Sequence, residues 1–313
     1  MVRYLVEHGA DVRIAKEHNV TNVMVSARYA HQEMIAYLVD ELGCDVNECD
    51  DDGRSALFDA VNSGSLETVQ FLLERGARNF RATFDHMSPL MWAAEKRRAD
   101  LVDVLSHHCS LLELIEAKEL LASAFVWREH GTCDLERSFE QISRAIELRS
   151  IHSFPKVVLS ATAEVFENRQ ECQTIDQLED LRSNPIGIHV EALLVRERLL
   201  GPANSEYLHS LRYHGAWLAD NGQHNRAVAF WMYELALRRQ YSIPIDTEYL
   251  RIFASLFAEI VFQSLPIPTH ALLQVMTATS DELACHTTEN DYNMHTLLFL
   301  VTVASQIPIE EFY

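Results

Sequence analysis

Glycine and proline are scarce in this sequence, which has 10 glycines and 8 prolines among 313 residues. So few turn-forming residues favour a mostly helical protein with short connections. Glycine-rich phosphate-binding loops, GxSxG elbows and HExxH motifs are all absent from the sequence. We therefore expect a protein that is not an enzyme, has no catalytic residues and needs no cofactor.

Paired cysteines are also lacking. The six cysteines are scattered without CxxC spacing: Cys44, Cys49, Cys109, Cys133, Cys172 and Cys285. This usage fits a reducing compartment and argues against a disulfide framework. The run His107-His108-Cys109 could supply zinc ligands, but structural zinc sites usually combine short paired spacings. We expect no metal site.

Long apolar runs and a positive charge balance are missing too. Residues 297–303 and 254–267 are too short or too polar to cross a bilayer, and Glu7 and Asp11 interrupt the opening run. The net charge is −20 and the isoelectric point about 5.1. Nucleic acid and anionic membranes are therefore poor partners, and basic peptides are suitable ones. We expect an intracellular protein in the cytoplasm, with the nucleus as a second location.

A repeated unit of about 33 residues dominates the first third of the chain. Residues 53–76 (GRSALFDAVNSGSLETVQFLLERG) combine a turn glycine, a short helix start and a second amphipathic helix. The glycines that end these units, Gly9, Gly43 and Gly76, are 34 and 33 residues apart (43 − 9 and 76 − 43), as are the helix starts Thr21, Ser55 and Ser88. This period and pattern are typical of ankyrin repeats.

The ankyrin pattern covers residues 1–110. Repeats are expected at 18–51, 52–84 and 85–117, and the third contains Ser88-Pro89-Leu90, with proline at a favourable early helix position. Residues 2–9 resemble the second helix of a repeat whose first helix is missing. Since solenoid repeats bury their apolar faces only against neighbours, we expect the chain to be a fragment of a longer protein.

Residues 111–313 are predicted to form a second, wholly helical domain. Residues 114–127 and 135–149 indicate one helical hairpin, and Thr174 to Gln177 has the form of a capping box. In residues 205–240, small and bulky residues alternate at spacings of 3, 4, 5 and 4, a pattern typical of a tetratricopeptide (TPR) hairpin; they are Gly215, Leu218, Gly222, Ala227 and Trp231. The predicted fold is all-α, an ankyrin solenoid followed by a TPR-like solenoid.

The acidic stretch 48–53 (ECDDDG) allows three interpretations. With Asp59 it imitates a calcium loop, but position 1 is Glu and position 12 is the shorter Asp. It also suits a solvated hairpin tip between repeats, or one edge of a peptide groove.

Ankyrin geometry places the residues after each first helix start on a concave surface. There the sequence combines aromatic and acidic side chains, which suit a peptide carrying Arg or Lys. Inner-helix residues such as Val25, Arg28, Ser63 and Lys96, and tip residues such as Glu48, Asp85 and His86, belong to the same surface. Plain solvent exposure is the alternative for each of them. The peptide-binding candidates are Tyr29, Asp50, Asp51, Asp59, Asn62, Trp92 and Glu95.

Four segments resemble the feminization-1 (Fem) family: residues 115–125 (IEAKELLASAF), 168–172 (NRQEC), 189–201 (HVEALLVRERLLG) and 213–221 (YHGAWLADN). The resemblance implies a substrate receptor of a cullin-RING ubiquitin ligase. Such receptors bind short C-terminal degrons, often ending in arginine, on the ankyrin face, and recruit elongin and cullin-2 through a C-terminal box.

Two parts of the family pattern have no counterpart here. The acids that hold the degron arginine align before Met1, and the recruiting box would follow Tyr313, so no arginine-clamping residue is transferred to this chain. We expect elongin and cullin-2 to bind only if the missing C-terminal part is present. The predicted function is a substrate-recognition adaptor for C-terminal degrons. The alternative is a non-degradative ankyrin/TPR scaffold that joins two proteins.

Overall fold

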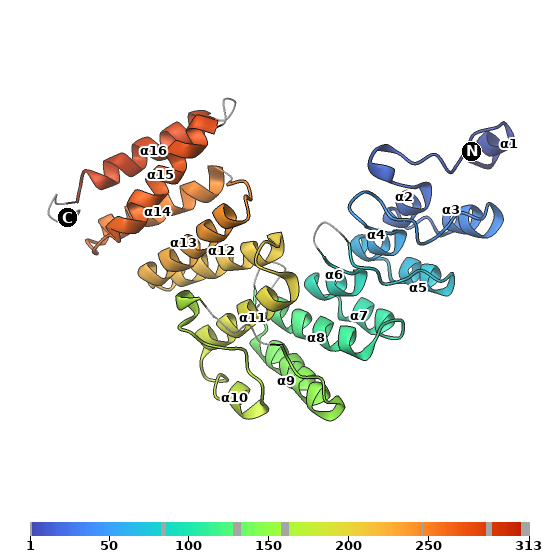
Figure 1. Cartoon of the computed structure of the whole chain (residues 1–313), viewed down its shortest axis with the longest axis horizontal. Coiled ribbons are helices and arrows are strands. Elements are labelled where there is room, and N and C mark those ends of the chain that lie inside the picture. Colours follow the sequence, from blue (N-terminus) through green and yellow to red (C-terminus); the bar gives the residue numbers. More distant parts are fainter. Residues whose placement is uncertain are drawn as a thin grey trace. The chain divides into compact units, whose positions relative to one another are not determined.

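The computed structural model describes residues 2–82, 86–127, 133–157, 163–245, 247–285 and 290–307. These residues form helices joined by turns and irregular connections, with one isolated antiparallel bridge between Cys49 and Ser55 (Figure 1). The prediction of an all-α solenoid is confirmed. The chain divides into two compact units, residues 1–160 with 170–201, and residues 161–169 with 202–313. The predicted domain boundary at residue 110 marks the change from ankyrin repeats to TPR-like helices, which is a different kind of division from these compact units. That boundary stays a prediction.

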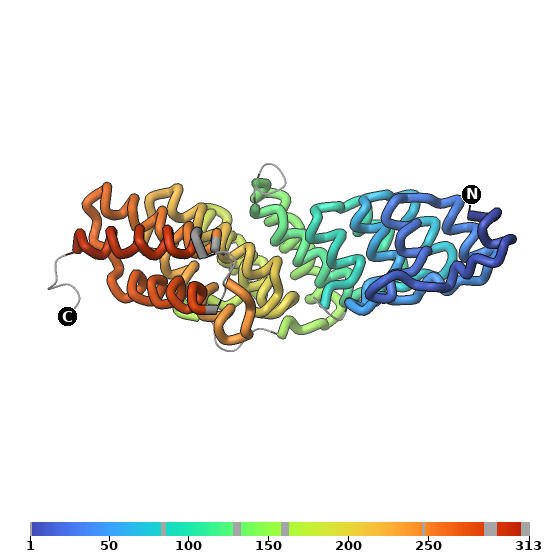
Figure 2. Tube along the Cα trace, turned by 90° about the horizontal axis from the view of Figure 1, so that it is seen from above, coloured from blue at the N-terminus to red at the C-terminus, as the bar shows by residue number. Residues whose placement is uncertain are grey.

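The first unit begins with a row of helical pairs, which lie side by side in Figure 2. A short helix α1 (Val2–Glu7) and a 3-10 turn η1 (Glu17–Asn19) precede them. The pairs are α2 (Asn22–Arg28) with α3 (Gln32–Ala36) and the π-helical turn η2 (Tyr37–Glu41), α4 (Ala56–Ser63) with α5 (Leu66–Glu74), and α6 (Pro89–Glu95) with α7 (Ala99–Ser106).

The helix starts follow from local signals. The Thr21 hydroxyl accepts a hydrogen bond from the Met24 N–H at 3.3 Å, and the Ser88 hydroxyl accepts one from Met91 at 3.2 Å. Such caps satisfy backbone donors that have no partner inside the helix, and each contributes about 1 kcal/mol. Gly76 has φ 82°, the left-handed conformation expected for the glycine that ends the second helix. The helix starts predicted at Thr21 and Ser88 and the helix end predicted at Gly76 are confirmed.

Small buried residues let neighbouring repeats approach closely. Ala27, Ala60 and Ala93 recur every 33 residues on the first helices of the repeats, and all three have no exposed surface. Leu57 and Leu72 are equally buried beside them. Full burial of a leucine stabilises the fold by roughly 1.5–3 kcal/mol, so these contacts hold the repeats together.

The rest of the first unit contains α8 (Leu111–Phe125), α9 (Leu135–His152), α10 (Ile175–Glu179) and α11 (Pro185–Leu200). Helix α8 packs on α6 of the last ankyrin pair, on α9 and on α11. The predicted α8–α9 hairpin is confirmed, and so is the capping box at the start of α10, where Thr174 and Gln177 exchange hydrogen bonds.

The second unit contains the 3-10 turn η3 (Glu164–Phe166) and the helices α12 (Ser205–Asp220), α13 (His224–Gln240), α14 (Thr247–Phe262), α15 (Thr269–Cys285) and α16 (Asn290–Ala304). Gly215 on α12 faces the ring of Trp231 on α13 so closely that a Cβ would lie 2.2 Å from Nε1. The small-against-bulky packing predicted for a TPR hairpin is therefore present. Among the described helices, none combines the length and apolar character that a membrane span requires.

Candidate functional site

An ion pair between neighbouring repeats lies on the first helices of the ankyrin pairs. Arg28 at the end of α2 donates from Nε to Asp59 Oδ1 at 3.1 Å and from Nη2 to Oδ2 at 3.2 Å. Asp59 on α4 is only 7% exposed. Burial raises the pKa of Asp59, and the Arg28 guanidinium opposes that rise. The carboxylate of this predicted candidate is thus engaged by the protein's own arginine.

The next repeat adds an aromatic and amide group. The Trp92 indole N–H on α6 donates to Asn62 Oδ1 at 3.0 Å, and its ring centroid lies 5.5 Å from that of Phe58. The Lys96 ammonium lies 4.5 Å from the Trp92 ring centroid. The structure thus brings the candidates Asn62 and Trp92 together, with one cation already placed over the ring.

Tyr29 caps the end of α2 next to Arg28, and 66% of its surface is exposed. Its ring stacks on His31 at a centroid distance of 6.2 Å. An exposed aromatic ring beside a guanidinium can stack on a peptide group or side chain.

The acidic stretch forms a hairpin tip, as the second of the three interpretations proposed. Asp50 accepts the Arg54 backbone N–H at 2.8 Å, and the exposed Asp51 accepts a hydrogen bond from the Asn19 side chain at 2.6 Å. Within the described ranges, no three His, Cys, Asp or Glu side chains come together as metal ligands would. Asp85, at the following tip, lies outside the described residues.

Glu95 is not placed as an open groove residue. It is 7% exposed, and its Oε1 accepts a hydrogen bond from Nη2 of Arg196 on α11 at 2.6 Å. The partner lies 101 residues away in sequence. The sequence analysis placed Glu95 on the concave surface because of its position in the ankyrin repeat. Repeat position alone could not show that α11, a later helix of the same unit, contacts Glu95.

The candidates therefore divide into two groups. Tyr29, Trp92 and the Asp50–Asp51 tip present atoms to solvent, whereas Asp59 and Glu95 neutralise arginines of the chain itself. The surface is aromatic and polar, and it is less acidic than the sequence alone suggests.

Three of the cysteines have pKa values shifted away from activation. Burial raises the pKa of the Cys44, Cys49 and Cys109 thiols, and neighbouring acids raise it further. A reactive cysteine needs a lowered pKa, which favours the thiolate.

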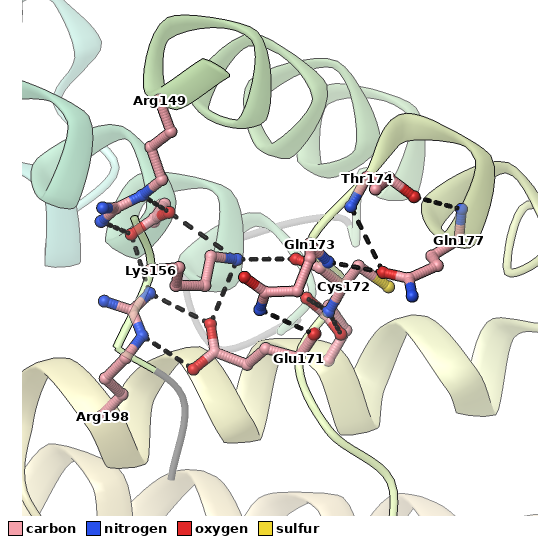
Figure 3. A network of polar contacts seen from close by, with 10 residues as sticks. Arg149, Lys156, Glu171, Cys172, Gln173, Thr174, Gln177 and Arg198 are labelled. Carbon is pink, nitrogen blue, oxygen red and sulfur yellow. Dashed lines mark hydrogen bonds and ion pairs between the residues drawn. The ribbon is translucent and has the colours of Figure 1, made fainter. Parts of the chain in front are cut away.

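A buried charge cluster in the first unit was not foreseen from the sequence (Figure 3). Glu119 on α8 accepts hydrogen bonds from Arg149 Nε and Nη2 at 2.7 and 2.9 Å and from Arg198 Nη2 at 2.8 Å. Arg198 also donates to Glu171 at 2.7 Å, and Lys156 Nζ lies 3.3 Å from the same carboxylate. Burial alone would raise the pKa of Glu119, but the three cations lower it to about 2.

Nothing local marks these residues, since each is an ordinary charged residue on a helix or a connection. The one signal lies in the segments 115–125, 168–172 and 189–201, which contain Glu119, Glu171 and Arg198 and carried the family resemblance. The cluster holds α8, α9 and α11 together, which gives those segments a structural role.

Comparison with known proteins gives two results. The family model for ankyrin repeats, in three copies, matches residues 42–113. The protein fem-1 homolog A-like of Mus musculus is 32% identical over 295 residues, which is 81% of this chain and 44% of that protein. Protein fem-1 homolog A of Homo sapiens is 29% identical over 314 residues, covering 82% and 46%. Protein fem-1 homolog C of Bos taurus is 32% identical over 180 residues, covering 55% and 29%.

The chain thus spans about half the length, or less, of the curated relatives it matches. The ankyrin repeats and the fem-1 relationship together support a protein-interaction role, carried by a repeat scaffold. With similarity over about four fifths of its length and the ankyrin solenoid in place, the chain belongs to the fem-1 family.

Proposed function

We propose that this chain recognises substrates for a cullin-RING ubiquitin ligase by binding short C-terminal peptides, in particular peptides that contain arginine. The observation that carries the proposal is the aromatic and polar surface of the ankyrin helices, where the Tyr29 ring is exposed and the Trp92 indole lies against the Asn62 amide. Membership of the fem-1 family supports it.

Each group on this surface has a task in the proposal. A peptide arginine can stack on the Tyr29 ring and donate to Asp51, because a guanidinium pairs with both aromatic faces and carboxylates. Asn62 and the Trp92 indole offer an amide and a ring to the peptide backbone. Asp59 would take part only by exchanging Arg28 for the ligand's arginine, since one carboxylate accepts one bidentate guanidinium.

In this proposal the chain does no chemistry itself. Ubiquitin transfer to lysine would be carried out by other subunits, and elongin and cullin-2 would bind only where a C-terminal recruiting part is present. The cytoplasm is the proposed location, with the nucleus as a second one.

The test compares peptides of one sequence that end in arginine, citrulline or alanine, titrated into the full chain. We expect the arginine peptide to bind at least about tenfold more tightly than the other two, a difference of about 1.4 kcal/mol. Tyr29→Ala should weaken binding to a similar degree. The matched control is Tyr4→Ala, another exposed tyrosine, on α1. Equal affinity for the three peptides, or equal effects of the two variants, would refute the proposed surface.

The ligase assignment needs a separate measurement. The version of the protein extended to the length of its relatives is precipitated from a mixture containing elongin and cullin-2. Recovery of both supports the adaptor role. If peptides bind but neither subunit is recovered, the chain is a scaffold without a role in degradation.

A further inference from the structure

A cavity lies in the first unit beside the helices that follow the ankyrin repeats. At the end of α9 the chain encloses an open cavity of about 410 Å³. Arg149 and Lys156 lie at this cavity, and the hydroxyls of Ser150 and Ser153, the Gln173 amide and the Phe154 ring complete its polar and apolar walls. Although the whole chain has a net charge of −20, none of the residues lining the cavity is acidic.

Both cations are held by acceptors of the buried cluster, and Lys156 Nζ also lies 3.8 Å from Glu119. Glu119 accepts from Nε and Nη2 of Arg149, which leaves the Nη1 group for another acceptor. Lys156 donates to the Cys172 carbonyl at 3.0 Å and lies beside Glu171 (Figure 3). The side chains are 8% and 2% exposed, so the charges are held in a low-dielectric setting where they attract an anion more strongly than in water.

The charge count around the cavity favours an added anion. Three cations, Arg149, Lys156 and Arg198, face three carboxylates, Glu119, Glu171 and Glu191. Glu191 is 1% exposed and accepts the Cys172 backbone N–H, and burial raises the pKa of its carboxyl group. When Glu191 is protonated, the three cations face only two carboxylates, and the cluster has a net charge of +1.

We propose that this cavity binds a small oxyanion, a carboxylate or a phosphate, between the Arg149 Nη1 group and the Lys156 ammonium. Ser150, Ser153 and Gln173 supply hydrogen-bond donors at the exposed rim, and Phe154 covers the carbon part of the ligand. The size suits a ligand of metabolite dimensions, since ligand pockets usually measure about 300–1,000 Å³. This site is independent of the proposed peptide surface.

The test is calorimetric titration of the full chain at constant ionic strength with inorganic phosphate, 3-phenylpropionate and 3-phenylpropanamide. We expect at least one anion to bind, and the amide to bind at least about tenfold more weakly than the acid if the carboxylate is the ligand. The anion that binds identifies the source of the oxyanion. If neither anion binds better than chloride, or if 3-phenylpropionate is the anion that binds and the amide binds equally well, the proposal is wrong.

A variant pair locates the binding. Ser150→Glu adds a carboxylate at the exposed rim and should weaken anion binding at least about tenfold. Its matched control is Ser280→Glu, an exposed serine on α15 in the second unit, which should bind like the unchanged chain. If Ser150→Glu melts at a lower temperature, Ser153→Asp gives the same test, because Asp tolerates the left-handed conformation found there (φ 55°). Equal binding by rim and control variants would overturn the proposal.

Discussion

His189 is a buried histidine whose surroundings keep it neutral. It is 3% exposed on α11, and its ring meets the edge of Trp127 at a centroid distance of 5.2 Å. Burial lowers the pKa of His189 from 6.5 to about 4. Because the folded pKa lies below the unfolded one, the unfolded chain binds more protons between these values.

Stability should therefore fall as the pH falls through this window. The contribution of neutral His189 to the free energy of unfolding is fully present above pH 6.5 and is lost as the pH falls towards 4. The total loss is about 3 kcal/mol. Urea unfolding should be measured at intervals of half a pH unit. As the pH is lowered, the free energy of unfolding should fall more steeply for the unchanged chain than for His189→Gln. Between pH 6.5 and 4.5 the difference in slope approaches about 1.4 kcal/mol per pH unit. Parallel curves for the two proteins would show that His189 does not carry the effect.

Gly215 is required by the ring that it faces. A Cβ there would lie 2.2 and 2.5 Å from Trp231 Nε1 and Cδ1, and the ring is anchored by its hydrogen bond to the Arg212 carbonyl at 2.9 Å. Replacing a helical glycine by alanine normally gains about 1 kcal/mol. Here the clash outweighs that gain.

We expect Gly215→Ala to reduce the free energy of unfolding by about 1–3 kcal/mol, as overpacking does. In the background of Trp231→Leu, where the ring is gone, the same change should be neutral or stabilising. Thermal and urea unfolding of the four proteins in this cycle measure the coupling between the two positions. Additive effects would contradict the proposed contact.

At the scale of single residues, part of the site could be predicted. The small-against-bulky pair of Gly215 and Trp231 follows from spacing within one hairpin. Asp59 was expected on the inner face, and its partner Arg28 lies 31 residues earlier, close to one repeat period. That offset is a usable signal, since side chains one period apart meet across adjacent repeats. The partner of Glu95 lies 101 residues away, and no period connects the two.

At the scale of elements, the buried cluster joins three helices, α8, α9 and α11. No local sequence pattern predicts the ion pairs between them. Glu119 on α8 receives hydrogen bonds from Arg149 on α9 and Arg198 on α11. Removing one member of a buried ionic group leaves the other charges uncompensated, which costs about 3–5 kcal/mol.

Glu119→Gln should therefore destabilise the first unit by about 3 kcal/mol or more. The matched control is Glu116→Gln, one turn earlier on the same helix, where the carboxylate pairs with the half-exposed Arg81 at 3.1 Å. That pair is worth less than about 1 kcal/mol, since solvent screens it. Urea unfolding gives the free energy of unfolding of both variants. If Glu119→Gln and Glu116→Gln lose equal amounts of it, the buried cluster stabilises the unit no more than a surface ion pair does.

The elements themselves were predictable where local signals mark them. Thr21 and Ser88 cap their helices, and Gly76 takes the left-handed conformation that its place after a helix requires. The cluster of Figure 3 could not be predicted in the same way. Its members come from α8, from α9, from two connections and from α11, and only the folded unit brings them together.

At the scale of the whole molecule, charge acts at a distance. The chain has 46 acidic and 26 basic residues, yet the ankyrin surface itself is partly neutralised by Arg28 and Lys96. The excess of negative charge should therefore affect mainly how fast a positively charged ligand associates. It should affect the contacts made in the bound complex much less. Long-range attraction of this kind raises the association rate and is screened by salt.

For a peptide ending in arginine, raising the salt concentration from 50 to 500 mM should lower the association rate constant by about tenfold or more. The dissociation rate should change much less, because the contacts with Tyr29 and Trp92 are short-ranged. Stopped-flow anisotropy of a dye-labelled peptide follows both rates, and the citrulline peptide, which has one charge less, is the control with a weaker salt dependence. If salt acted chiefly on dissociation, the ion pair between the peptide arginine and Asp51 would supply more of the affinity than the contacts with Tyr29 and Trp92, and Asp51→Asn would then reduce the salt effect on dissociation.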